Sequence, residues 1–277
     1  DEVGFIITEI CKDGLLKIRP LGGIDPRVVL SKVIYFPESK LTGVIGIVPV
    51  HLQKDGDLEK VPDWDGIYVS IGAESDKDAK KSVKEGDYAV FSTRFKEWDG
   101  IITGKAFDDR VGCFILTELL KHRYDFNLYA VFSSQEESGL RGIRTALHKI
   151  KPEIGFNLEC TFAGDIPKEK EVSPSTELGK GPAITVMDRS TISSPKLVRY
   201  LTELACKNKI PYQFKRTVAG GTDAGYINTC KEGIPCVTVS VPTRYIHSPV
   251  CLARKSDIDE TLKLMNTALR NLKKQKF

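Results

Sequence analysis

The pattern of hydrophobic and polar residues divides the chain into two parts near residue 98. In the first part, short runs rich in branched and aromatic residues alternate with turn-forming stretches such as KDG, PES and KEGD. The runs are VGFIITEI, LLKIRPL, VVLSKVIYF, LTGVIGIV, GIYVSIGA and DYAVFSTRF. Because hardly any helical periodicity interrupts them, the pattern predicts a small β-barrel or sandwich over residues 3–97.

The second part alternates strand-like and helix-like runs. A helix that is apolar nearly all round, and therefore buried, is predicted from Arg110. Further helices are predicted from the N-cap Ser194, with Pro195 in the first turn, and from Ser256. Apolar strands are predicted at 127–134 (NLYAVFSS), 153–160 (EIGFNLEC), 181–188 (GPAITVMD) and GIPCVTVSVPT, and a polar loop at 167–181. This alternation predicts an α/β fold, a layered mixed sheet flanked by helices.

Composition narrows the class of protein. The 277 residues fit one large domain or two, and 41 basic against 37 acidic residues (net charge +4) give no basis for a nucleic acid or membrane partner. The seven cysteines are odd in number and form no CxxC, so buried thiols in a reducing compartment are expected. No signal peptide or membrane-spanning stretch stands out, which predicts a cytoplasmic protein.

Acidic residues and one histidine gather where the predicted strands of the second part end. These residues are Asp108, Asp109, Glu136, Glu137, Glu159, Asp165 and His247. Open α/β sheets bind their ligands at the carboxyl ends of strands, so we expect these side chains to lie along one edge.

A divalent cation would explain why Glu136 and Glu137 stand side by side, since two adjacent carboxylates repel each other. Zinc, cobalt and manganese accept carboxylate oxygen and imidazole nitrogen, and two such ions bridged by a carboxylate form a hydrolytic site. Glu137 could then bind metal while Glu136 serves as a general base.

Each motif alone has an ordinary explanation. The EE pair suits a solvated turn, and the DDR sequence suits helix capping. A lone His247 is more often a hydrogen-bonded structural residue, and Glu159 could pair with a basic side chain.

Five strings occur in one order along the chain: GKAFDDRVG, SSQEESGLRG, LECTFAGDIP, AGGTDAGYI and VPTRYIHSP. Together they resemble the tetrahedral aminopeptidase family of dinuclear metallopeptidases, which includes glutamyl aminopeptidases and whose members are often mislabelled endoglucanases. The resemblance implies a metal-dependent aminopeptidase that hydrolyses the N-terminal residue of peptides through a metal-bound water and a glutamate general base. It also implies two divalent metal ions, zinc or cobalt in the first place and manganese as a further fit.

The resemblance assigns roles to individual residues. Asp108 would bridge both metals, and Glu136 would be the general base. Glu137 and His247 would complete one metal site, and Glu159 would bind the other metal.

Further positions match the family more loosely. Asp1 matches an aspartate that orients a histidine ligand from behind. That histidine would lie two residues upstream of Asp1, so the catalytic part is expected to lack its N-terminal portion and one complete metal site. Weakened metal binding and poor activity of this chain are therefore expected. Gln213 and the segment Gly220–Ala224, with Gly221 and Thr222, match a stretch that lines the substrate cleft.

The resemblance also implies the domain organisation. A catalytic domain is expected over 1–6 and 98–277, with an inserted PA-like β-barrel domain over 7–97. That domain commonly forms dimers, which can assemble into a homo-dodecamer.

Two other classes of function stay open at this stage. A non-catalytic assembly or peptide-binding homologue would explain a missing histidine. Glycoside hydrolysis would use the same carboxylates as an acid/base pair without metal, but it leaves His247 and Asp108 without roles.

Overall fold

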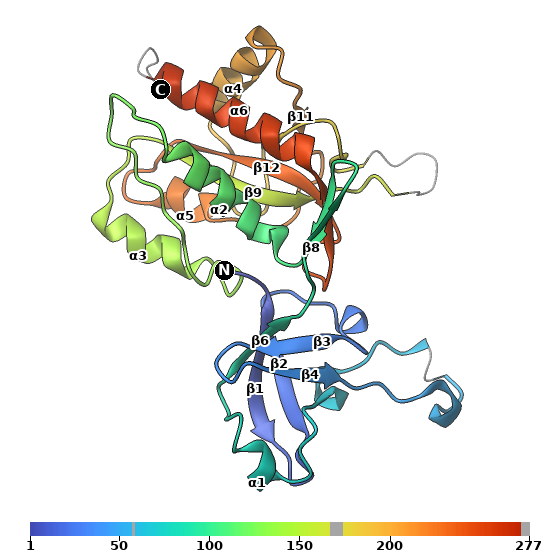
Figure 1. Ribbon diagram of the computed structural model, residues 1–277. Helices are drawn as coiled ribbons and strands as arrows, with labels where there is room; N and C mark the ends of the chain where they lie inside the picture. The colour runs from blue at the N-terminus through green and yellow to red at the C-terminus, as the bar shows by residue number, and fades with distance from the viewer. Residues whose placement is uncertain (57–58, 167–173, 273–277) are drawn as a thin grey trace. The chain divides into compact units, whose positions relative to one another are not determined.

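The computed structural model describes residues 1–56, 59–166 and 174–272, and its contacts divide the chain into two units (Figure 1). Unit 1 comprises Asp1, Lys96–Ile246 and Cys251–Phe277, and unit 2 comprises Glu2–Phe95 and His247–Val250. Residues 167–173 of the polar loop predicted at 167–181 lie outside the described residues.

Unit 2 contains a closed barrel in the order β1-β2-β5-β4-β3-β6. The strands are β1 (Gly4–Ile10), β2 (Leu16–Leu21), β3 (Val33–Phe36), β4 (Leu41–Ile45), β5 (Tyr68–Ser70) and β6 (Tyr88–Phe91). Short helices η1 (Pro26–Val28), η2 (Val50–Leu52), η4 (Trp64–Gly66) and α1 (Asp76–Ala79) lie in its connections. Inward residues such as Phe5, Ile18 and Ile34 are fully buried in one apolar core, which confirms the predicted small barrel.

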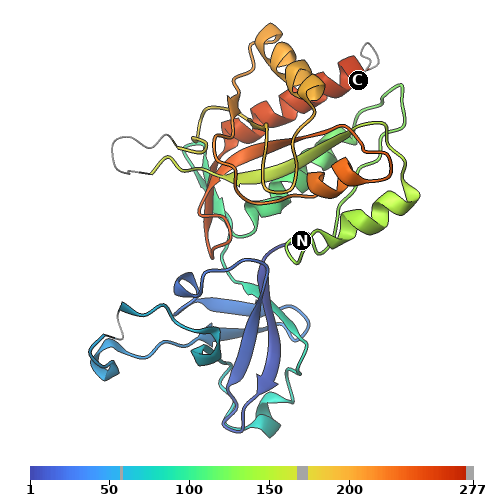
Figure 2. The same cartoon turned by 180° about the vertical axis from the view of Figure 1, so that it is seen from behind.

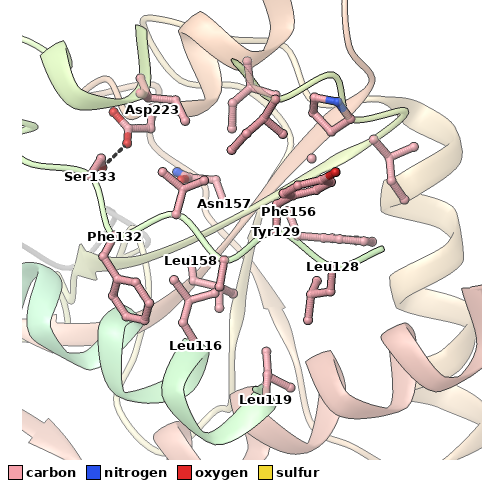
Figure 3. Close-up of a pocket in the computed structure, with 18 of the residues that line it drawn as sticks. Leu116, Leu119, Leu128, Tyr129, Phe132, Ser133, Phe156, Asn157, Leu158 and Asp223 are labelled. Carbon is pink, nitrogen blue, oxygen red and sulfur yellow. Dashed lines mark hydrogen bonds between the residues drawn. The ribbon is translucent and has the colours of Figure 1, made fainter. Parts of the chain in front are cut away.

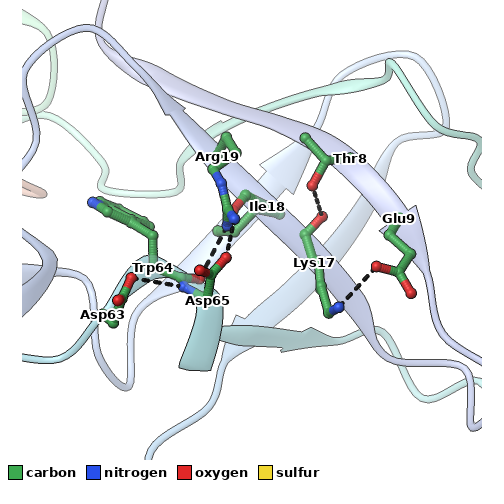
Figure 4. Close-up of polar contacts among 8 residues, drawn as sticks. All are labelled: Thr8, Glu9, Lys17, Ile18, Arg19, Asp63, Trp64 and Asp65. Carbon is green, nitrogen blue, oxygen red and sulfur yellow. Dashed lines mark hydrogen bonds and ion pairs between the residues drawn. The ribbon is translucent and has the colours of Figure 1, made fainter.

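Polar contacts hold the η4 connection against the outside of the barrel (Figure 4). The Arg19 guanidinium pairs with Asp65 and also donates to the Trp64 carbonyl oxygen at 3.2 Å. On the same strand as Arg19, Lys17 Nζ lies 2.8 Å from Glu9 Oε2 of β1, and the two residues face each other across the β1–β2 pair. Opposite charges therefore stand directly across the strands, an arrangement that favours this register.

Unit 1 is built on a mixed sheet in the order β11-β10-β12-β13-β8-β7, with β9 paired to β12. The strands are β7 (Lys96–Trp98), β8 (Ile101–Gly104), β9 (Gly155–Phe162), β10 (Ala183–Thr185), β11 (Gln213–Phe214), β12 (Cys236–Arg244) and β13 (Cys251–Arg254). The β9–β12 pair is parallel along its whole length, and β12 is buried throughout except at Arg244. Such two-sided burial explains why these strands read as continuous apolar runs.

Helices cover both faces of this sheet, as predicted (Figures 1 and 2). They are α2 (Phe107–Leu119), α3 (Arg141–Lys149), α4 (Pro195–Lys207), α5 (Ala224–Thr229) and α6 (Lys255–Asn271). Helices α2, α4 and α6 share one apolar core with Leu158, Val237 and Val239 of the central strands. Helices α3 and α5 pack with Cys236 in a second core, and α5 lies at the front in Figure 2.

The strand predicted at 127–134 is wrong, because the described residues show no strand there. A strand needs a neighbour to accept and donate its backbone hydrogen bonds, and this segment pairs with none of the strands described. Its aromatic side chains stay open to solvent, with Tyr129 57% and Phe132 50% exposed. An apolar run therefore predicts where a strand can form, while pairing decides whether it does.

Smaller differences have similar local causes. The helix α2 is not buried all round, since Phe114 is 48% exposed. The run predicted at 181–188 forms a strand only over 183–185, where it pairs with β12. All seven cysteines are free thiols, but only Cys160, Cys236 and Cys251 are buried, and Cys206 is exposed.

Among the residues described, no helix has both the length and the apolar character needed to span a lipid bilayer.

Candidate metal centre

The first two acidic residues stand at an irregular start of α2. Asp108 and Asp109 lie just after β8 ends at Gly104, and the backbone angles of both residues depart from helical values. Asp109 Oδ1 accepts a hydrogen bond from the backbone N–H of Gly112 at 3.2 Å, which caps the regular part of the helix. Because the chain is irregular here, two consecutive carboxylates can turn toward the same region.

Glu159 lies within β9, two residues further from the strand end than the sequence suggested. It is only 6% exposed, and it alternates with Leu158 and Cys160, which belong to the apolar core of the opposite face. Asn157 Nδ2 donates to Glu159 Oε1 at 3.1 Å and lies 3.5 Å from Thr238 Oγ1 on β12. Asn157, Glu159 and Thr238 thus form a polar strip across the two central strands, and this strip orients the buried Glu159 carboxylate.

Three side chains of unit 1, those of Asp108, Asp109 and Glu159, place one possible ligand atom each within 4.8 Å of one another. Asp108 and Glu159 are two of the residues that the sequence predicts as metal ligands. Carboxylate oxygens are donors that suit a divalent cation such as zinc, cobalt or manganese.

His247 lies in the turn that joins β12 to β13. The two strands pair with each other at Thr243 with Ala253 and at Arg244 with Leu252, so the sheet of unit 1 holds both ends of the turn. The Nδ1 atom of His247 lies 2.7 Å from the carbonyl oxygen of Gly23. A proton on Nδ1 satisfies that contact and leaves Nε2 as the nitrogen able to bind a metal.

The electrostatics of the group in unit 1 also suit a cation. Burial raises the pKa of Glu159 well above its ordinary value, and the charges of Asp109, Asp108 and Glu136 add to that rise. Burial and the charge of Asp108 raise the pKa of Asp109 in the same way. Several carboxylates that oppose each other's ionisation are stabilised when a divalent ion neutralises them.

Glu136 lies in the turn after the 127–133 segment, where its carbonyl oxygen accepts hydrogen bonds from Gly139 and Leu140. Its own backbone N–H donates to Asp1 Oδ1 at 3.1 Å. Glu136 and Asp1 line the same cavity as Asp109 and Glu159. The structure therefore brings Asp1 to the backbone of Glu136, and the Glu136 charge acts on the acidic group.

The Gly220–Ala224 segment packs against the loop after β10. The Thr222 backbone N–H donates to Ser190 Oγ at 3.1 Å, and Thr222 Oγ1 lies 3.5 Å from Thr238 Oγ1. A side chain on Gly221 would approach Ser190 Cβ to 3.1 Å, which is tighter than ordinary contact. Thr222 thereby joins the polar strip that includes Asn157.

Gln213 is occupied by backbone contacts. Its side-chain amide donates to the carbonyl oxygens of Glu177 and Gly181 at 2.9 and 3.0 Å, and its oxygen accepts from the Glu177 N–H at 2.9 Å. These bonds fasten the 177–181 loop to β11.

The sequence analysis assigned no metal-related role to two residues that lie in or beside the acidic group, Asp109 and Asn157. Asp109 looked like a helix cap, yet it belongs to a ligand group as well, and its adjacency to Asp108 was the available clue. No sequence pattern points to Asn157, because its contact with Glu159 depends on the alternation of side chains along β9, which places both residues on the same face.

The chain is similar to known proteins over nearly its whole length. The M42 glutamyl aminopeptidase family matches residues 1–264. Lysyl aminopeptidase of Pyrococcus furiosus is 35% identical over 287 aligned positions, which cover 100% of this chain and 81% of that protein.

Solved structures give the same picture. A TET aminopeptidase from a marine sediment Thaumarchaeota archaeon has a TM-score of 0.92 at 34% identity, covering 98% of this chain and 79% of that one. The TET1 peptidase of Pyrococcus horikoshii, described as assembling into a tetrahedron or a large octahedral shell, has a TM-score of 0.84 at 32% identity. That match covers 97% of this chain and 81% of the TET1 chain.

Proposed function

Because the chain belongs to the M42 glutamyl aminopeptidase family, we propose that it releases N-terminal residues from peptides using two divalent metal ions and Glu136 as general base. The family is a peptidase family, so the enzyme is a hydrolase that acts on peptide bonds. The metal count, the residue roles and the mechanism are the parts that we propose.

The observation that carries the proposal is the group of three carboxylates in unit 1, Asp108, Asp109 and Glu159, whose oxygens lie close enough together to hold one cation. A carboxylate with two oxygens can contact one ion on each side, as bridged metal pairs require. Asp108, Glu137 and His247 would hold one ion, and Asp108 and Glu159, together with Asp109, would hold the other. The first set contains imidazole and favours zinc or cobalt, whereas the second set contains only carboxylates and is less selective.

The ions would supply Lewis acidity at the scissile carbonyl and make a water molecule more acidic. Glu136 would take the proton of the attacking water and later deliver it to the leaving amine. Asn157 would hold the Glu159 carboxylate in place, and Asp1 would fix the backbone at Glu136 through its hydrogen bond. Gly221 and Thr222 would border the bound peptide.

The test is turnover of aminoacyl-p-nitroanilides with free and with acetylated amino groups, with chelator and after return of zinc or cobalt. We expect cleavage only of substrates with free amino termini, loss of turnover with chelator and recovery of turnover when metal is returned.

The substitution Glu136→Gln should lower kcat by a factor of about 100 or more while metal still binds, because the general base is lost and the metal ligands remain. Glu203→Gln, on the exposed side of α4, is the matched control.

Unchanged turnover in Glu136→Gln would remove Glu136 from the role of base. Metal-insensitive cleavage of a glucan would instead favour the glycoside hydrolase alternative. Absence of any turnover with metal bound would favour a binding protein.

We further propose that the chain forms homo-oligomers, as the TET1 peptidase of Pyrococcus horikoshii does, and that unit 2 makes the contacts between copies. Large apolar side chains of the 47–61 region support this, since Val48, Val50, Leu52 and Val61 are 58–67% exposed. Light scattering should give a mass above that of one chain, and Leu52→Asp should lower it. Ser82→Asp, an exposed position of the same unit, should leave the mass unchanged.

A further inference from the structure

Residues 215–223 connect β11 to α5 and contain no helix or strand, so side-chain and turn contacts fix their conformation. At the end next to α5, Asp223 Oδ2 accepts a hydrogen bond from Ser133 Oγ (Figure 3). Both residues line a cavity in unit 1 that Asn157 and Glu159 also line. The loop therefore ends beside the acidic group of the candidate metal centre.

The turn after β10 holds the middle of this loop. Asp188 is only 2% exposed, and its Oδ1 accepts hydrogen bonds from the Ser190 N–H at 2.7 Å and from Ser190 Oγ at 2.9 Å. Ser190 Oγ in turn accepts from the Thr222 N–H at 3.1 Å. The Arg189 N–H donates to the Gly220 carbonyl oxygen at 2.9 Å. The buried Asp188 thus fixes Ser190, and Ser190 fixes Thr222.

Two glycines pack directly against Ser190. A Cβ at Gly221 would lie 3.1 Å from Ser190 Cβ, and a Cβ at Gly225 would lie 2.7 Å from the same atom. Side chains do not approach as closely as 2.7 Å, so a side chain at position 225 would displace Ser190. Packing and hydrogen bonds therefore hold Ser190 together in one position.

The hydroxyl groups around Thr222 have a defined direction. Asn157 Nδ2 donates toward Thr238 Oγ1 at 3.5 Å, so Thr238 can give its own proton to Thr222 Oγ1, which also lies at 3.5 Å. Thr222 Oγ1 accepts a further hydrogen bond from the Ala224 N–H at 3.3 Å. With both contacts made to its oxygen, the Thr222 hydroxyl can donate its proton to a bound acceptor such as a peptide carbonyl oxygen.

We propose that Ser190 is a positioning residue, which holds Thr222 so that the Thr222 hydroxyl donates to a carbonyl oxygen of the bound peptide. The inference rests on the proposed function, in which Gly221 and Thr222 border the peptide. Ser190 acts only through Thr222, since its own hydroxyl is engaged with Asp188 and with the Thr222 N–H. Its removal should weaken peptide binding and leave the chemical step intact.

The first measurement is hydrogen–deuterium exchange of the free chain, followed by mass spectrometry. Ser190→Ala removes the acceptor of the Thr222 N–H, so exchange at residues 219–223 should accelerate at least about tenfold. Ser194→Ala is the matched control, because Ser194 is a half-buried serine of unit 1 whose side chain does not cap α4. It should leave exchange at residues 219–223 unchanged. This measurement needs neither metal nor substrate.

The second measurement is KM and kcat for a tripeptide with a free amino terminus. Ser190→Ala should raise KM about fivefold and keep kcat within about twofold, as expected when a contact shared by substrate and transition state is lost. Thr222→Val should raise KM at least as much, and Thr222→Ser, which keeps the hydroxyl, should restore it. Adding Ser190→Ala to Thr222→Val should raise KM by no more than about twofold further, because Ser190 acts through the Thr222 hydroxyl.

Faster exchange together with a higher KM would support the inference. Unchanged exchange in Ser190→Ala, an unchanged KM, or additive effects of the two substitutions would each overturn it. A parent chain that hydrolyses no peptide with metal supplied would overturn the proposed function, and the binding role of Ser190 with it. The exchange measurement separates these failures, because it does not depend on turnover.

Discussion

Glu159 occupies a place where an apolar side chain would ordinarily lie, in the middle of a buried strand. Its carboxylate has one described hydrogen-bond donor from a side chain, Asn157, and its neighbours Asp108 and Asp109 carry the same charge. A buried charge in such surroundings persists only with a hydrogen bond and a compensating ion. These surroundings support the proposed role of Glu159 as a metal ligand that Asn157 orients.

Replacing Asn157→Ala should weaken zinc or cobalt binding about 10–100-fold, because the donor that orients Glu159 is lost. Isothermal titration of the chelator-treated protein measures the affinity. The control is Asn208→Ala, at the exposed end of α4, where the side chain serves only a helix carbonyl. Equal affinities for the Asn157 variant and the parent protein would contradict the role.

A second residue-scale contact links Asp165 to Arg244 at the end of β12. Burial opposes ionisation of Asp165, but the hydrogen bonds from Arg244 Nε at 2.7 Å and from the Leu178 N–H outweigh it and hold the pKa of Asp165 below its usual value. The ion pair therefore stabilises the fold above the unfolded-state pKa of about 3.9, and this contribution disappears as pH falls through the lower folded-state pKa.

Asp165→Asn should lower the free energy of unfolding by about 1 kcal/mol at pH 7, since both partners are partly exposed. The difference in unfolding free energy between the variant and the parent protein should become smaller below about pH 4, where the Asp165 carboxylate of the parent protein itself becomes protonated. Urea unfolding at several pH values measures both. A difference in unfolding free energy that stays constant down to pH 2 would show that the charge of Asp165 is not the cause of the stabilisation.

At the scale of elements, the first turn of α6 anchors the loop before β10. Asp257 is 1% exposed and accepts hydrogen bonds from the N–H groups of Gly179 and Gly181 at 2.7 and 2.9 Å. Gly181 has a φ of +78°, and a Cβ there would meet the Pro211 carbonyl oxygen. The helix start and the loop thus hold each other in one conformation.

Asp257→Ala should destabilise the protein by about 3 kcal/mol, because two buried N–H groups lose a charged acceptor. Chemical denaturation followed by circular dichroism measures the change. Asp259→Ala, exposed on the same helix, is the control and should change stability by less than about 0.5 kcal/mol. Similar losses for the two variants would mean that the loop contacts contribute little.

The sequence predicts correctly those helices and strands whose own residue pattern indicates them. The helix from Pro195 and the strand at Cys236–Arg244 follow from periodicity, and the proximity of Asp108 to Glu159 follows from their positions near predicted strand ends. The strand predicted at 127–134 is wrong, because a strand forms only beside a neighbouring strand, which the apolar run itself does not encode. Asn157 was missed for a similar reason, since only the pairing of β9 with β12 places it between Glu159 and Thr238.

At the scale of the whole molecule, the two units have separate apolar cores. Phe5 and Phe36 are buried within the barrel, whereas Leu197 and Leu264 are buried within the layered unit. A unit with its own core can fold by itself. We therefore expect residues 2–95 alone to give a cooperative thermal transition by circular dichroism, and Phe5→Ala to abolish or lower that transition. A gradual, non-cooperative melt of the isolated unit would contradict this.

The strands by which the chain enters and leaves the barrel are neighbours, since Phe5 pairs with Ala89 and Ile6 with Tyr88. Pairing of these two strands brings the start and the end of the barrel together. The residues before and after the barrel then behave as if only a short loop joined them. Loop entropy grows with the logarithm of length, so this shortening lowers the entropic cost of docking Asp1 beside Glu136 by about 1 kcal/mol. Early formation of the barrel would thus hasten the docking of Asp1 beside Glu136, and unit 2 would assist the folding of unit 1 without contributing a strand to its sheet.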